Sequence, residues 1–126
     1  MTVAEIVGLY YDAWQARHGD FSAVPLADDF AFTGPVASFT DAAGYRAMAC
    51  EAGPLVITFS VRHQFTDGNR VCSIIDWEMA LPVAPMTSAE ILEVEDGEIV
   101  RGNAARQGGL DGLHLLRDAQ IALAVA

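Results

Sequence analysis

Three carboxyl groups set into apolar segments are the residues of this sequence with the clearest chemical potential. Asp76 and Glu78 stand two positions apart within the largely apolar run of residues 73–81, and Glu90 precedes two further apolar residues. Strand alternation places Asp76 and Glu78 about 7 Å apart on one face, where burial and a neighbouring like charge raise a carboxyl pKa. Such a carboxyl exchanges protons near neutral pH, so we expect an acid–base centre built from these groups.

Each candidate also has a structural interpretation. Asp76 can pair with an arginine such as Arg62, Glu78 can belong to a dimer interface, and Glu90 can be part of a core face. His63 ends an alternating apolar row and is a further candidate for proton transfer, although a hydrogen-bonded interfacial role also accounts for it. One histidine and two carboxylates would suit a divalent cation, but their spacing matches no recognised ligand pattern, and we predict no metal site.

Composition removes several classes of function. The chain has 126 residues, enough for one domain spanning 1–126, and it has no lysine, which excludes Schiff-base chemistry because that chemistry needs a side-chain amine. Its net charge of −10 disfavours nucleic acid and anionic membranes as partners. No apolar run approaches the roughly 20 residues that span a bilayer, and the N-terminus lacks a basic secretory start, so we expect a cytoplasmic protein. Cys50 and Cys72 form neither a CxxC pair nor a zinc-ligand pattern.

Helices in the first half of the chain must help to position these groups. Thr2 and Glu5 form a capping box, after which apolar residues recur at helical spacing as far as His18. Tyr10 and Trp14 lie in the middle of this stripe, where they can line a core or a pocket. We also predict a short helix capped by a serine and ending at residues 28–29, a brief strand over 30–33, and a helix over 40–51.

The rest of the chain predicts two hairpins and a closing helix. Polarity alternates with a period of two in the hairpins, and each turns at an Asp-Gly pair, which accepts the positive φ angles of a tight turn. The predicted strands cover residues 55–66, 70–81, 87–94 and 99–107, and the predicted helix covers residues 111–125.

Two segments of this pattern resemble a known superfamily. Residues 26–36 (LADDFAFTGPV) and residues 91–100 (ILEVEDGEIV) are similar to segments of the nuclear transport factor 2-like superfamily, particularly its SnoaL-like polyketide cyclase and ketosteroid isomerase branches. The resemblance spans most of residues 3–107. It implies an α+β fold in which a cone-shaped, curved antiparallel sheet packs on N-terminal helices around a deep apolar cavity, and it implies a homodimer.

The resemblance to ketosteroid isomerases is incomplete at the site. The aspartate base of those enzymes falls on Gly34 in this chain. Their helix-1 tyrosine and protonated strand carboxyl, which hold an oxyanion, correspond to Tyr10 or Tyr11 and to Glu90. Isomerase chemistry by the usual base is therefore not expected, whereas oxyanion binding is.

The related limonene epoxide hydrolases carry an Asp-Arg-Asp set that this chain also keeps only in part. Asp76 matches one aspartate, while the arginine position is Ile74 and the second aspartate position is Ala104. Ordinary epoxide hydrolysis is therefore not expected, because water activation needs both a base and a proton donor.

Together these observations predict a cofactor-independent acid–base enzyme for a small apolar metabolite. In this hypothesis Asp76 moves the proton and Tyr10 or Glu90 stabilises negative charge on oxygen. A noncatalytic binding or assembly domain is the alternative, since a fold does not decide function. The predicted pocket walls are Trp14, Phe30, Phe32, Cys72, Ile74 and Leu92.

Overall fold

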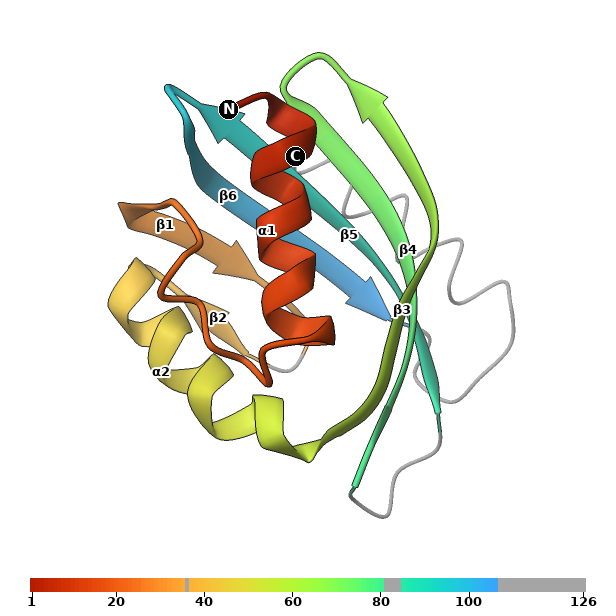
Figure 1. Ribbon diagram of the computed structural model, residues 1–126. Helices are drawn as coiled ribbons and strands as arrows, with labels where there is room; N and C mark the ends of the chain where they lie inside the picture. The colour runs from red at the N-terminus through yellow and green to blue at the C-terminus, as the bar shows by residue number, and fades with distance from the viewer. Residues whose placement is uncertain (36, 81–84, 107–126) are drawn as a thin grey trace.

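The computed structural model describes residues 1–35, 37–80 and 85–106 and has a curved six-stranded sheet with two helices on one face (Figure 1). The sheet order is β2-β1-β6-β5-β4-β3. In chain order the elements are α1 (Val3–Gln15), β1 (Leu26–Thr33), β2 (Ser38–Phe39), α2 (Ala42–Ala52), a 3-10 turn (Gly53–Leu55), β3 (Val56–Asp67), β4 (Arg70–Met79), β5 (Met86–Glu95) and β6 (Glu98–Arg106).

The α+β class and the curved sheet are confirmed. The sheet is mixed, however, and not purely antiparallel. Strand β1 pairs in parallel with β6, whereas every other pair of neighbouring strands in the described sheet is antiparallel. Both predicted hairpins form, and their turns use positive φ at Gly68, Asp96 and Gly97. The predicted helix over 111–125 lies outside the described residues. No helix in the described part of the chain is long and apolar enough to cross a membrane.

The first helix begins as predicted, with Thr2 and Glu5 capping each other's backbone amides. The second helix begins one residue later than predicted, since Asp41 accepts from the Gly44 amide at 2.7 Å and is therefore the cap. The short helix predicted to end at residues 28–29 is wrong. Strand β1 already starts at Leu26, because this segment pairs with β6.

An aromatic core joins the two helices to the concave face of the sheet. Tyr45 of α2 lies at its centre, with ring centroids 5.2 Å from Phe30 and 5.4 Å from Phe21. Tyr10 of α1 packs edge-on against the same Phe21 at 5.2 Å. Such edge-to-face contacts match the positive ring edge to the negative ring face, so they fix ring orientation as well as burying area.

Two glycines hold the loop after α1 against the end of α2. A Cβ atom added at Gly53 would lie 1.9 Å from the backbone oxygen of His18, and one added at Gly19 would lie 2.0 Å from that of Ala49. Gly19 also has φ of +85°. Only glycine allows this backbone approach, so these positions set how closely the two helices come together.

Candidate functional site

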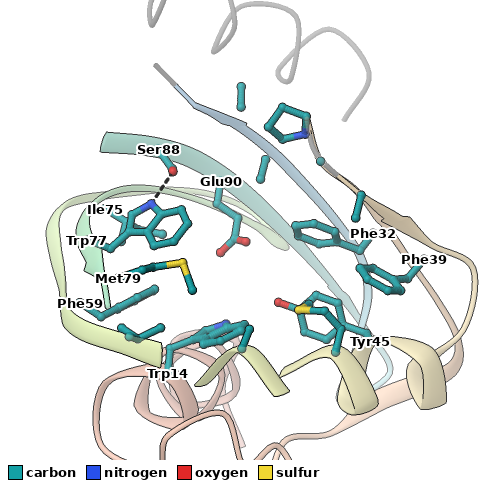
Figure 2. A pocket seen from close by; sticks show the side chains of 18 residues that line it. Trp14, Phe32, Phe39, Tyr45, Phe59, Ile75, Trp77, Met79, Ser88 and Glu90 are labelled. Atoms are coloured by element: carbon teal, nitrogen blue, oxygen red, sulfur yellow. Dashed lines mark hydrogen bonds between the residues drawn. The ribbon is translucent and has the colours of Figure 1, made fainter. Parts of the chain in front are cut away.

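An apolar cavity of about 310 Å³ lies between the helices and the concave face of the sheet. That volume is at the small end of the range for ligand sites. Figure 2 shows aromatic side chains from both helices and from several strands around it, together with the carboxyl group of Glu90. The described lining residues are Trp14, Phe32, Gly34, Pro35, Ala37, Phe39, Tyr45, Met48, Ala52, Val56, Phe59, Ile75, Trp77, Met79, Ser88, Glu90, Ala104 and Ala105.

Glu90 of β5 is the acidic group of this lining. Its register partner on β4 is Ser73, and only 7% of the residue is exposed. Tyr11 donates a hydrogen bond to Oε1 at 2.8 Å, and Tyr10 donates one to Oε2 at 3.1 Å. Because these tyrosines are consecutive residues of α1, one helix turn presents a phenol to each oxygen of the carboxyl group. The sequence leaves open whether Tyr10 or Tyr11 belongs to the site, and in the structure both of them contact Glu90.

Burial controls the protonation of this group. It raises the pKa of Glu90 from 4.5 to about 7, against the hydrogen bonds from Tyr11 and Tyr10, which lower it. Burial and the adjacent Glu90 charge also raise the pKa values of both tyrosines well above their ordinary value. The phenols therefore stay protonated near neutral pH and act as hydrogen-bond donors, while Glu90 exchanges its proton in that range.

A second layer of hydroxyl groups supports the carboxyl group. The Tyr10 hydroxyl forms a hydrogen bond with the hydroxyl of Tyr45, which itself lines the cavity. On the far side, Ser73 hydrogen-bonds Tyr11 and accepts from Gln64 Nε2 at 3.2 Å. In the described part of the chain, every buried polar side-chain atom has a hydrogen-bond partner. The geometry of Glu90 is therefore set by a connected polar network within an apolar wall.

A second polar contact lies elsewhere in the same wall. Trp77 of β4 donates from Nε1 to the Ser88 hydroxyl at 2.8 Å, drawn as the dashed line in Figure 2. This bond satisfies the indole nitrogen and turns the rest of the Trp77 ring toward the cavity, so the tryptophan acts as an apolar wall residue.

The prediction that Asp76 and Glu78 of β4 face the cavity is wrong. Register with β5 places Ser73, Ile75 and Trp77 on the same side as Glu90, and the alternate positions on the outer side of the sheet. Asp76 thus lies opposite Thr87, with 38% of its side chain exposed, and accepts from both Arg62 Nε at 2.8 Å and Arg62 Nη2 at 2.6 Å. The guanidinium group lowers the Asp76 pKa. The structural interpretation of Asp76 is the one that its contacts support.

The observed orientation of β4 and β3 also places four other candidate residues away from the cavity. Glu78, Cys72 and Ile74 alternate with the lining residues of β4. His63 of β3 pairs with Ile74, is exposed, and has its ring 6.3 Å from that of Phe65. None of the four is among the described lining residues, because the strands turn these positions to the outer side.

The remaining pocket predictions divide between lining and core. Trp14 and Phe32 line the cavity. Phe30 and Leu92 are fully buried in the core behind it, and Tyr10 reaches the site only through its hydroxyl group. Most of the lining was not predicted from the sequence. Tyr45 is one example, and its helical spacing from Ala42 and Ala49, which are buried on the same side of α2, was the available signal.

In the described part of the chain, no group of three or more His, Cys, Asp or Glu side chains is placed so that it could hold a metal ion. Gly34, at the position of the isomerase base by resemblance, lines the cavity and brings no side chain to it. Oxyanion binding or proton transfer by Glu90 is the chemistry that this arrangement offers.

Comparison with known proteins supports the resemblance seen in the sequence. Residues 7–102 match the SnoaL-like domain family. No curated protein matches the sequence. Solved structures with this fold include an NTF2-like protein from Cytophaga hutchinsonii, at 20% identity and a TM-score of 0.73, with 85% of this chain and 91% of that chain covered.

Two further structures of this fold are named as enzymes. An LEH-like epoxide hydrolase from M. tuberculosis aligns over 98% of this chain and 95% of that chain, with 18% identity and a TM-score of 0.70. A steroid delta-isomerase from Pseudomonas aeruginosa aligns over 98% of this chain and 92% of that chain, also with 18% identity and a TM-score of 0.70. At these identities the likeness shows the fold.

Proposed function

The chain belongs to the SnoaL-like domain family, and from this premise we propose that it is an acid–base enzyme that acts without a cofactor on a small apolar molecule held in the cavity. Glu90 is the proton-transfer group. The observation that carries the proposal is a buried carboxyl group that faces an apolar cavity and has a pKa of about 7. A group with that pKa is populated in both protonation states under ordinary conditions, as a general acid or base requires.

The tyrosines have a positioning role in this proposal. Tyr10 and Tyr11 hold one carboxyl oxygen each, so the carboxyl plane is fixed before a ligand enters. Tyr10 gives its single hydroxyl proton to Glu90, so Tyr45 is the donor in its hydrogen bond with Tyr10 and supports the carboxyl group through that residue. When Glu90 is protonated, its own O–H can donate to a ligand oxygen that gains negative charge, which retains the expected oxyanion role as a second mode of the same site.

The role of Glu90 as a base can be tested with a probe reaction, without knowledge of the natural substrate. The Kemp elimination of 5-nitrobenzisoxazole needs only a base that removes the ring C–H proton while the N–O bond breaks, and the product is a coloured cyanophenolate. We expect kcat/KM to rise with pH and level off above about 7, because the ionised form of Glu90 is the base. Glu90→Gln should lower kcat/KM by about 100-fold or more.

Asp76→Asn is the matched control. It also neutralises one acidic residue of the sheet, but on the outer side, so it should leave the rate and the pH profile unchanged. Glu90-independent turnover would overturn the proposed role of Glu90. Binding of the probe without turnover by the native chain would instead favour the alternative, a noncatalytic small-molecule-binding domain.

The homodimer and the cytoplasmic location belong to the same proposal. Phe65 supports the dimer, because this large apolar side chain is 62% exposed at the position opposite Cys72, on the outer side of the sheet. Light scattering of the purified chain distinguishes a dimer from a monomer directly.

A further inference from the structure

The cavity contains a buried acid, Glu90, that has no basic partner among the residues described in the structure. Glu90 faces it and accepts only from two neutral phenols, and no arginine or histidine is among the described lining residues. The arginines whose side chains the structure describes are engaged elsewhere: Arg17 with Asp12, Arg46 with the carbonyl groups of Phe21 and Val24, Arg62 with Asp76, Arg70 with Asp67, and Arg101 with Glu93. An ionised Glu90 therefore has no counter-charge from these groups.

The walls around this carboxyl group are suited to a cation. Trp14 and Phe59 lie nearly parallel, with ring planes 14° apart and centroids separated by 6.2 Å, and Trp77 lies opposite Phe59 on the neighbouring strand. Phe32, Phe39 and Tyr45 form the other side in Figure 2. Aromatic faces attract a cation through their quadrupole, most strongly where water is excluded.

The charge of the whole chain acts in the same direction. A net charge of −10 attracts cations toward the molecule and repels anions. An anionic ligand would also place a second negative charge beside Glu90 in a low-dielectric cavity, which is costly. The site thus discriminates by charge as well as by size.

We propose that the cavity binds a small organic cation, an ammonium group carrying apolar substituents, with the Glu90 carboxylate as its counter-ion and the aromatic rings as its walls. This inference rests on the proposed function in that both use Glu90 in the same cavity, and it narrows the substrate class from apolar molecules to apolar amines. Each carboxyl oxygen accepts one phenol, so a lone pair on each remains to face the ligand.

A matched pair of probes isolates the charge. Choline and 3,3-dimethylbutan-1-ol have the same shape, but only choline carries the positive charge, and that charge does not titrate. Calorimetric titration of the full chain at pH 8.5 should give choline an affinity at least about tenfold above that of the alcohol. Below pH 7 the choline affinity should fall about tenfold per pH unit, because protonation of Glu90 removes the counter-ion.

Glu90→Gln keeps the shape of the side chain and removes its charge. In this variant the preference for choline over the alcohol should fall by about tenfold, to what the aromatic walls alone provide, and the pH dependence should disappear. Equal affinities in the native chain, no binding of choline at millimolar concentration, or an undiminished choline preference in Glu90→Gln would each overturn the inference. Glu90-dependent Kemp elimination without choline preference would refute this inference alone, whereas choline preference without any such turnover would refute the proposed enzyme alone.

Discussion

The raised pKa of Glu90 makes a quantitative prediction for stability. Between pH 4.5 and about 7 the folded chain keeps a proton that the unfolded chain has released, so the free energy of unfolding contributed by this group falls as pH rises. The difference between 4.5 and about 7, at about 1.4 kcal/mol per pKa unit, amounts to about 3 kcal/mol. This contribution is fully present below pH 4.5 and lost above pH 7. It is a large share of the roughly 5–15 kcal/mol that stabilises an ordinary domain.

Urea unfolding of the native chain and of Glu90→Gln between pH 4 and pH 8.5 measures this contribution. Other acidic residues also titrate in this range, but they are common to both proteins, so the difference between the two free energies of unfolding cancels them. Gln resembles the protonated acid in shape and neutrality, and we expect native stability to fall by about 3 kcal/mol relative to the variant as pH rises. Parallel pH profiles for the two proteins would refute the argument that burial dominates the pKa of Glu90.

Two further predictions concern the support of the site. Tyr11→Phe removes a hydrogen bond that stabilises the ionised carboxylate, so the Glu90 pKa should rise above about 7 in a carbon-13 NMR titration, and an unchanged or lower value would contradict the assigned contact. Gly53→Ala forces a Cβ against the His18 carbonyl and should cost about 1–3 kcal/mol in thermal unfolding. Gly8→Ala, in open space within α1, is its control and should stabilise by about 0.5–1 kcal/mol; equal effects would show that backbone approach is not the cause.

The elements of this fold whose signals are local could be predicted from the sequence. The capping box at Thr2 and the Asp-Gly turns act within a few residues, and the structure has the helix start and both hairpins where those signals place them. Strand β1 is different. It pairs with β6 at Leu26 and again at residues 31–33, and β6 lies about 70 residues further along the chain, so this distant partner overrides the local helix signal at residues 22–29.

The candidate site was also predicted only in part, because some of its residues depend on strand register that no local signal gives. Glu90 was a candidate because it matches the strand carboxyl of the ketosteroid isomerases by resemblance, and Tyr10 because it lies in the apolar stripe of α1. The face of β4 could not be assigned, because both of its faces carry apolar residues. Residues 80–85, between β4 and β5, contain no Asp-Gly pair that would fix the register, so the pairing of Ser73 with Glu90 is not readable from the sequence. The resemblance to epoxide hydrolases then favoured Asp76, which the observed register puts on the outer side.

Trp14 and Trp77 are the only tryptophans of the chain, and both of them line the cavity. The tryptophan fluorescence of the native protein therefore originates entirely from the cavity that Glu90 faces, with one indole on a helix and the other on the sheet. A ligand that enters the cavity, or a proton that leaves the carboxyl group, changes the surroundings of both indoles at once. The unmodified chain is in this sense its own optical reporter, suited to screening ligands without any label.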